Sequence, residues 1–173
     1  SLTEYYLKID ATAFDDPSGN SYAGIHDTTS LSFTTGDAVD PTLTSSNPAD
    51  DATAIAEDSN IVLNFTEAVD AESGNIVIYK TSDDSVVESI DVTSNQVTGS
   101  GTTQITINPS VTLESSTEYY VKIDTTAFDD PNGNSYAGIT DTTSLSFTTG
   151  DAVDPTLTSS NPADDATAIA EDS

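Results

Sequence analysis

The feature that most constrains this chain is an internal duplication. Residues 1–59 and 115–173 align at a constant offset of 114, and 54 of the 59 positions are identical. The five differences are Leu2/Ser116, Leu7/Val121, Ala11/Thr125, Ser18/Asn132 and His26/Thr140. Solenoid units are only about 20–50 residues long, whereas 114 residues is the length of a compact domain. The duplication therefore predicts a tandem array of whole domains.

The repeat divides the chain into three parts. Residues 1–36 are predicted to be the later part of one repeat. Residues 37–150 form a complete repeat that opens with a linker at 37–40, and residues 151–173 hold the next linker and the first strands of a third repeat.

The charge balance excludes several classes of partner. Thirty acidic residues face only Lys8, Lys80 and Lys122, which gives a formal net charge of −27. Such a chain repels phosphate backbones and anionic lipids, so nucleic acid and membrane surfaces are poor partners, whereas cations are attracted. The chain has no cysteine, so disulfides and thiolate metal sites are excluded, and its apolar runs are too short to span a membrane. Abundant Ser, Thr, Asp and Asn with little Lys predict an exported protein in extracellular, calcium-containing surroundings.

Alternating apolar residues predict short strands throughout the repeat. One run places Ile61, Leu63 and Phe65 on one face, and 76–79 is a continuous apolar strand, whereas 67–74 is predicted to be a polar loop. Turn signals recur about every 8–12 residues and no amphipathic helix is visible, which is typical of an all-β immunoglobulin-like antiparallel sandwich of about seven or eight strands. The predicted core consists of Ile61, Leu63, Phe65, Ile105, Ile107, Tyr119, Val121, Ile123, Leu145 and Phe147.

Several segments resemble bacterial Ig-like domain repeats of S-layer proteins and large repetitive surface adhesins. The segments that carry the resemblance are 46–55, 61–69, 108–109, 117–121 and 128–134. This resemblance covers the whole repeat and implies an exported, tandemly repeated spacer on the bacterial cell surface. It also implies stiffening by calcium and no catalysis.

Catalytic groupings are not evident in the sequence. The single histidine, His26, is replaced by Thr140 in the second copy, whereas a triad or a histidine zinc site needs an imidazole in each working domain. The pair Asp129 and Asp130 has no evident pocket to shift its pKa values. Lys122 alternates with core residues and is predicted to point outward, which excludes an internal isopeptide bond. The chain is therefore expected not to be an enzyme.

One oxygen-rich loop has the spacing of a calcium site. Positions 1, 3, 5 and 12 of a calcium loop fall on Asp130, Asn132, Asn134 and Asp141, and the first copy supplies Asp16, Ser18, Asn20 and Asp27. Position 6 is Ser135 instead of the glycine of an EF-hand, and Asp at position 12 is shorter than the usual Glu. A turn capped by Asx side chains explains the same residues without metal. Both explanations remain open at this stage.

A second calcium placement follows from the expected topology. The loops 67–74 and 129–134 are predicted to share the pole where the linker 37–40 enters, and the turns at Asp50-Asp51 and Asp83-Asp84 share the opposite pole. Two unit charges about 4 Å apart repel by roughly 1 kcal/mol in water, so stacked acidic poles favour a bridging cation. The expected ligands of this cation are Glu67, Asp70, Asp37 and Asp40, and the turn of the preceding repeat that corresponds to Asp50 and Asp51 is a less direct source. Oxygen donors restrict the choice to hard cations, and the flexibility of the loops favours Ca²⁺ over Mg²⁺. The alternative is a flexible joint with solvated charges.

Three functions fit these features. The leading prediction is a structural extender module of a bacterial cell-surface repeat protein, an adhesin, S-layer protein or filament, whose partners are neighbouring repeats. An adhesive module that binds glycan or a partner protein is the alternative, although near-identical repeats favour the spacer. A filament subunit completed by a strand such as 155–169 of a neighbouring molecule is the third possibility.

Overall fold

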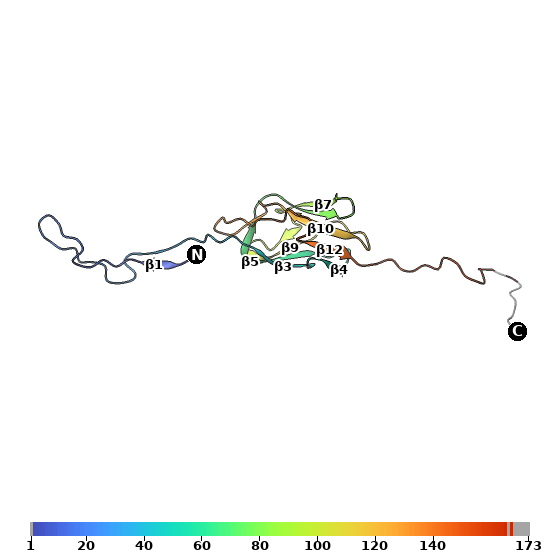
Figure 1. The fold of residues 1–173 in the computed structure, drawn as a ribbon, viewed down its shortest axis with the longest axis horizontal. Coiled ribbons are helices and arrows are strands. Elements are labelled where there is room, and N and C mark those ends of the chain that lie inside the picture. Colours follow the sequence, from blue (N-terminus) through green and yellow to red (C-terminus); the bar gives the residue numbers. More distant parts are fainter. Residues whose placement is uncertain (1, 166, 168–173) are drawn as a thin grey trace, which may run out of the picture.

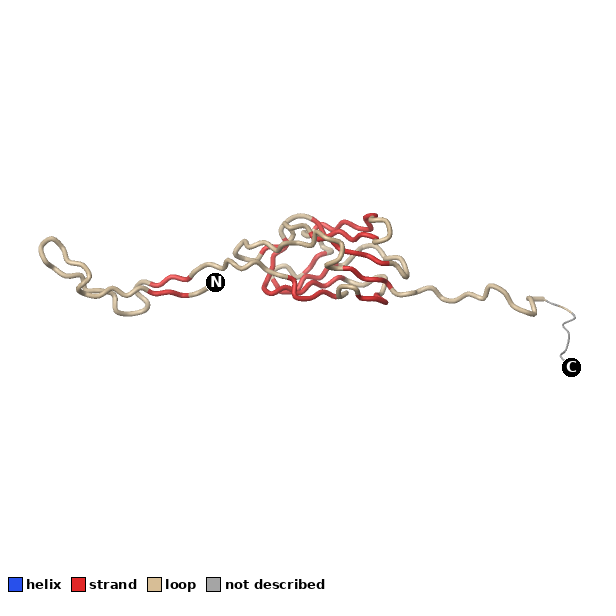
Figure 2. Tube along the Cα trace, viewed as in Figure 1, coloured by secondary structure: helices blue, strands red, loops and turns tan. Residues whose placement is uncertain are grey.

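The computed structural model describes residues 2–165 and 167, and it contains strands and no helix in this part of the chain. Three parts follow one another along the longest axis (Figure 1). An extended N-terminal segment (residues 2–36) precedes a central domain (residues 37–150), and an extended C-terminal segment (described over residues 151–165) leaves from the opposite end. Nearly all strand residues lie in the central domain (Figure 2). No helix suited to crossing a membrane occurs among the described residues.

The central domain is a sandwich of two sheets. The first sheet has the order β4-β12-β10-β6-β7 and the second has the order β11-β5-β9-β8, with β3 paired to β5. The strands of the first sheet are β4 (Ala52–Ile55), β12 (Ser146–Thr149), β10 (Glu118–Ile123), β6 (Asn75–Lys80) and β7 (Ser85–Asp91). Those of the second are β11 (Phe128–Asp129), β5 (Ile61–Ala71), β9 (Thr102–Ile107), β8 (Val97–Thr98) and β3 (Leu43–Asn47). All pairs are antiparallel except β12 with β4, which is parallel.

The alternating sequence pattern is realised as a shared core between the two sheets. All ten residues predicted for the core are buried, which confirms the sandwich and its inward faces. Phe65 lies near the centre of an aromatic group, with ring centroids 5.6 Å from Phe128 and 5.1 Å from Tyr136. Further along the core, the rings of Tyr119 and Phe147 lie 6.0 Å apart.

One predicted loop is wrong in its boundaries. The polar segment predicted at 67–74 is largely strand, because β5 continues to Ala71. A register shift between Asn64 and Val69 restores the pairing with β9 and turns Val69, which is fully buried, into the core. The strand persists through polar residues because β11 pairs with its far end, and such long-range pairing leaves no periodic signal in the sequence.

The outer face of the first sheet carries one of the two lysines of the repeat. Lys122 Nζ lies 5.7 Å from the ring centroids of both Tyr79 and Tyr120, and these rings are stacked 4.9 Å apart. Its side chain therefore points outward, as the alternation predicts, and covers aromatic surface through a cation–π contact.

The N-terminal segment has the same backbone arrangement as the corresponding last part of the central domain. Its strands β1 (Glu4–Tyr6) and β2 (Ser32–Thr34) pair with Glu4 opposite Thr34, and the corresponding Glu118 lies opposite Thr148. No further strand covers this pair among the described residues, and its apolar side chains are exposed.

Candidate cation site at the linker

Three carboxylates meet where the linker enters the central domain. Asp37, Glu67 and Asp130 each offer an oxygen atom, and these atoms all lie within 4.8 Å of one another. Asp37 and Glu67 are half-buried, whereas Asp130 is only 3% exposed. We call these three residues the linker cluster.

The fold explains why residues so far apart in sequence meet here. Strand β11 pairs with the end of β5 through Phe128 opposite Ala71 and Asp129 opposite Asp70, so Asp130 is placed beside β5. On the other side, the backbone N–H of Thr42 donates to Thr66 Oγ1 at 3.0 Å, and the N–H of Thr66 donates to the Thr42 carbonyl at 2.9 Å. The linker is therefore fixed directly beside Glu67.

Asp130 is held in one orientation by its own loop. Its Oδ1 accepts the backbone N–H groups of Asn132 and Asn134 at 2.9 and 2.8 Å, and its Oδ2 accepts the Asn134 side-chain amide at 2.8 Å. Burial opposes ionisation of Asp130, but the hydrogen bonds from Asn134 and Asn132 outweigh it and hold its pKa below the ordinary value. A buried, ionised and preoriented carboxylate therefore lies at the centre of the linker cluster.

Glu67 experiences the opposite effect. Burial, followed by repulsion from Asp37, Asp130 and Asp40, raises the pKa of its carboxyl group. Neither lysine of the central domain relieves this repulsion, because Lys80 is ion-paired with Glu114 at 2.6 Å and Lys122 lies over the tyrosines. Three carboxylates without a cationic side chain between them form a donor set that fits a hard cation such as Ca²⁺.

The other acid predicted for the loop site, Asp141, forms a separate turn. Asp141 accepts the N–H groups of Thr143 and Ser144 at 2.8 and 2.7 Å and the Ser144 hydroxyl at 2.7 Å. These bonds, led by the Ser144 hydroxyl, lower the pKa of Asp141 to about 2. Asp141 lies outside the linker cluster, and the side-chain amides of Asn132 and Asn134 point their nitrogens at Asp130. The Asx-capped turns considered from the sequence are thus the arrangement observed.

The first copy repeats both turns. Asp16 accepts the N–H groups of Ser18 and Asn20 and the Asn20 side-chain amide, at 2.8–2.9 Å. Asp27 accepts the N–H groups of Thr29 and Ser30 at 2.8 and 2.6 Å, and the Ser30 hydroxyl together with these bonds lowers its pKa. The turns are therefore local structures that do not need the rest of the domain.

The remaining acids predicted for the junction are dispersed. Asp40 lies near enough to raise the pKa of Glu67, and Asp70 accepts the Ser100 hydroxyl at 3.3 Å. Asp50 accepts the backbone N–H of Ser146 at 2.9 Å, while Asp51 accepts its hydroxyl at 3.1 Å. Sequence reasoning placed Asp130 in the loop set and not at the junction. The local signal that favours the junction is the apolar Phe128 two residues before Asp130, which marks a strand that must reach the core.

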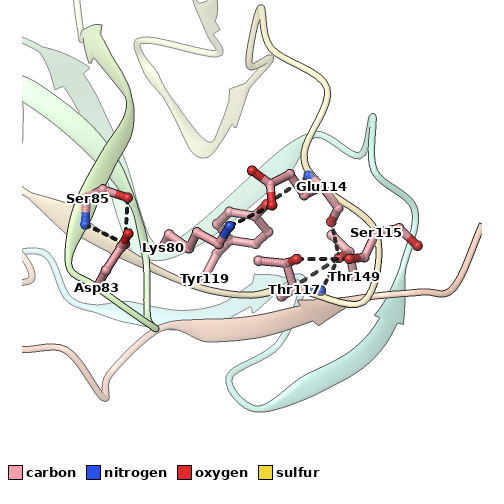
Figure 3. A network of polar contacts seen from close by, with 8 residues as sticks. All are labelled: Lys80, Asp83, Ser85, Glu114, Ser115, Thr117, Tyr119 and Thr149. Carbon is pink, nitrogen blue, oxygen red and sulfur yellow. Dashed lines mark hydrogen bonds and ion pairs between the residues drawn. The ribbon is translucent and has the colours of Figure 1, made fainter.

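At the opposite pole, hydrogen bonds hold β12, the last strand before the chain leaves the domain (Figure 3). Tyr119 Oη accepts the backbone N–H of Glu114 at 2.8 Å, and Thr149 Oγ1 donates to the Glu114 carbonyl at 2.6 Å. Thr149 Oγ1 also accepts the N–H of Thr117 at 2.9 Å. Beyond β12, the Ser115 hydroxyl donates to the Gly150 carbonyl and accepts the N–H of Ala152 at 3.0 Å. Both ends of the domain are therefore tied to the linkers next to them.

A recess of about 460 Å³ lies on the outer face of the first sheet. It is lined by acids and hydroxyls around Tyr120, namely Asp51, Thr81, Asp84, Glu118, Thr142, Thr143 and Ser146. Tyr120 donates its hydroxyl to Asp84 at 3.0 Å and is only 3% exposed. No aromatic side chain is among the exposed large hydrophobic residues between residues 41 and 149, and the half-buried Tyr79 is stacked on Tyr120.

The linker cluster predicts a pH dependence of stability in metal-free buffer. The folded state raises the pKa of Glu67, so the free energy of unfolding should increase as the pH falls through that raised value. Asp130 and Asp141 have lowered pKa values, so their contribution is present above the unfolded value of 3.8 and is lost as the pH falls toward about 2. Urea titrations across this range should show a maximum, and Glu67→Gln should remove the rise while leaving the loss in acid.

The architecture defines the class of this protein. Two facing sheets, a shared aliphatic and aromatic core and entry and exit at opposite poles make an immunoglobulin-like β-sandwich. Residues 37–149 match the family model described as bacterial Ig-like domain, and the chain belongs to that family.

Several solved structures match the chain at low sequence identity. CopC from Methylosinus trichosporium OB3b matches with a TM-score of 0.48 and 17% identity, over 67% of this chain and 99% of that chain. The N-terminal part of the bacterial S-layer protein SbsC matches with a TM-score of 0.44 and 21% identity, over 67% of this chain and 25% of that chain. PcoC, a methionine-rich copper resistance protein from Escherichia coli, matches with a TM-score of 0.40 and 19% identity, over 64% of this chain and 99% of that chain. No curated protein sequence matches the chain.

Proposed function

We propose that this chain is a structural extender of a bacterial cell-surface repeat protein, in which a calcium ion at each linker fixes successive Ig-like domains. The observation that carries the proposal is the linker cluster, in which Asp37 of the linker meets Glu67 and Asp130 of the following domain. The partners are neighbouring repeats of the same protein, the location is extracellular, and the chain performs no catalysis.

The position of Asp37 makes it a suitable coupling residue. It follows the last strand of the N-terminal segment, β2, by three residues, so a cation held by Asp37 would restrain the orientation of that strand. Asp151 occupies the same position one period later, because the offset between the copies is 114. Each linker of an array with this period would carry the same acid.

The donor set favours calcium over other metals. The three carboxylates are hard oxygen ligands, and backbone carbonyls and water would complete the six to eight ligands that Ca²⁺ takes. Copper is not proposed, because the chain has no methionine or cysteine and its one histidine, His26, lies outside the central domain. Asp130 would be a preoriented ligand, with Asp37 and Glu67 closing on the ion from the linker and β5.

Adhesion is the less supported function. The recess around Tyr120 is polar and acidic, but its aromatic ring is covered by Tyr79 and Lys122. Glycan sites generally expose a ring face, and the central domain has none exposed. The repeated sequence and the acidic linkers fit a spacer better.

The proposal predicts that calcium both stabilises and straightens the protein. Calcium that binds only the folded form should stabilise it by about 2.7 kcal/mol at 100 times its dissociation constant. The melting temperature of the 173-residue chain should therefore rise in calcium, and the radius of gyration of a polypeptide of two repeats should increase relative to chelator.

Two variants separate a site from general screening. Glu67→Gln should abolish both calcium effects, whereas Glu57→Gln removes the same charge outside the linker cluster and should preserve them. If magnesium or sodium chloride at equal ionic strength reproduces the calcium effects, the cluster is a screened surface and the proposal is wrong.

A further inference from the structure

The loop that carries Asp130 contains a chemically labile dipeptide. Asn132-Gly133 is the only Asn-Gly sequence in the chain, because every other asparagine precedes Ser, Pro or a larger residue. The side chain of an asparagine can be attacked by the backbone nitrogen of the residue that follows it, and glycine obstructs this attack least because it has no Cβ. The first copy has Ser18 at the position of Asn132, so only one of the two loops carries the reactive pair.

The structure leaves this dipeptide open to solvent. Pro131, Asn132 and Gly133 are all exposed. Apart from its chain neighbours, no heavy atom would lie within 4 Å of a Cβ atom at Gly133, and the φ of this residue is +86°. No packing therefore opposes a rotation that brings the Gly133 nitrogen to the side-chain carbon, Cγ, of Asn132.

Two hydrogen bonds keep the turn closed between reactions. The N–H of Asn132 donates to Asp130 Oδ1 at 2.9 Å, and the N–H of Gly133 donates to the Asp130 carbonyl at 3.0 Å. The Gly133 nitrogen must leave this carbonyl before it can attack, so the reaction requires local opening of the turn. Opening of an exposed loop costs little free energy compared with unfolding of the domain. The turn therefore slows the reaction without preventing it.

The neighbouring Asn134 is protected in ways that Asn132 is not. The side-chain amide of Asn134 donates to Asp130 Oδ2 at 2.8 Å, and its carbonyl accepts the N–H of Asp130 at 2.9 Å. Asn134 is also half-buried and is followed by Ser135. The amide of Asn132 lies 3.5 Å from the same oxygen, which is beyond the usual range of a hydrogen bond. The loop therefore restrains one asparagine and leaves the other able to rotate.

We propose that Asn132 is a site of spontaneous deamidation that alters the loop holding Asp130. A hydroxide ion removes the proton of the Gly133 nitrogen, and this nitrogen forms a bond to Cγ of Asn132. The bond from Cγ to the side-chain nitrogen then breaks, and this nitrogen takes a proton from water and leaves as ammonia, so that a cyclic imide remains. Water opens the imide at Cγ to give aspartate, or at the main-chain carbonyl to give isoaspartate. In sum, one water is consumed and one ammonia is released.

The isoaspartate product would change the setting of Asp130. Isoaspartate adds a methylene group to the main chain between Asp130 and Asn134, whose backbone N–H and side-chain amide both donate to Asp130. These two bonds depend on the length of the turn, so the longer main chain would not keep both. Asp130 would then lose donors that orient it beside Asp37 and Glu67. This inference concerns the covalent structure of the loop and does not depend on calcium.

The test incubates the whole 173-residue chain at physiological temperature in slightly alkaline buffer with chelator. Isoaspartate is detected with protein isoaspartate methyltransferase, which transfers a methyl group to that residue, and is located by mass spectrometry of peptides. Aspartate and isoaspartate should accumulate at Asn132 before any change is detected at Asn134 or Asn20. Hydrogen exchange at the backbone amide of Asn134 should be faster in the isoaspartate form than in the fresh protein.

Two variants serve as matched controls for the reaction. Asn132→Ser introduces the residue of the first copy and should accumulate no isoaspartate in this loop. Gly133→Ala keeps the asparagine but adds a Cβ, so the reaction at Asn132 should be slower. If Asn132 stays intact while other asparagines react, or if Gly133→Ala reacts as fast as the original chain, the proposal is wrong. Unchanged exchange at Asn134 in the isoaspartate form would contradict the effect on Asp130.

Discussion

Replacing Phe147 with alanine is expected to lower the free energy of unfolding of the central domain by about 3–5 kcal/mol. Phe147 is 2% exposed, lies on β12 and packs its ring 6.0 Å from that of Tyr119. The substitution would leave a cavity between the sheets, because strands held by hydrogen bonds cannot close over a missing ring. Urea denaturation followed by tyrosine fluorescence measures the change.

The duplication supplies a matched control for this variant. Phe33 stands in the same sequence surroundings on β2 but is 59% exposed. Phe33→Ala should therefore leave the urea midpoint of the central domain unchanged. Equal losses in the two variants would mean that both copies are packed alike in solution, and the difference in burial between them would be contradicted.

A second large effect is expected at Gly138. Its φ is +73°, and a Cβ atom there would lie 2.5 Å from the Ile123 carbonyl oxygen and 3.0 Å from the Thr125 nitrogen. Gly138→Ala should cost about 1–2 kcal/mol for the left-handed backbone and a further 1–3 kcal/mol, roughly, for displacing β10 from the following loop. Differential scanning calorimetry should show a lower melting temperature for the central domain.

Two other glycines distinguish the cost of the left-handed backbone at Gly138 from the cost of the steric clash. Gly133 has φ +86° with no heavy atom within 4 Å of a Cβ, so Gly133→Ala should show only the smaller conformational cost. Gly24 meets the Ile9 carbonyl at 2.5 Å, as Gly138 meets that of Ile123, but it lies in the N-terminal segment. Gly24→Ala should leave the melting of the central domain unchanged. Similar losses at Gly133 and Gly138 would show that the close approach to β10 is unimportant.

Part of the core was predictable because several strands carry their own periodic signal. Residues such as Ile105 and Ile123 have polar neighbours on both sides, and this alternation is sufficient to assign the buried face. The end of β5 was not predictable in the same way. Glu67 and Asp70 look like loop residues, and only the pairing with β9 and β11 keeps them in a strand.

The candidate site was predictable only in part, for a related reason. Asp37 and Glu67 were assigned to the linker because Ig-like topology brings their segments to one pole. Asp130 was grouped by spacing with Asp141, but Thr143 and Ser144 follow Asp141 closely and take up its carboxylate in a local turn. Asp130 is capped by its own turn in the same way, so what distinguishes it from Asp141 is the pairing of β11 with β5, which places it beside Glu67.

The parallel pairing of β4 with β12 determines how the domain bears mechanical load. The chain enters through the linker before β3 and leaves after β12 at the opposite end (Figure 1). A pull on the two linkers therefore slides β12 along β4 instead of peeling one strand from the sheet. The pairing of β12 with β4, with Phe147 opposite Ala52 and Thr149 opposite Ile55, is then loaded along its whole length, together with the hydrogen bond of 2.8 Å from the Gly150 N–H to the Ile55 carbonyl. Rupture requires several hydrogen bonds to break at once, so tension between the two linkers of this domain is resisted in shear.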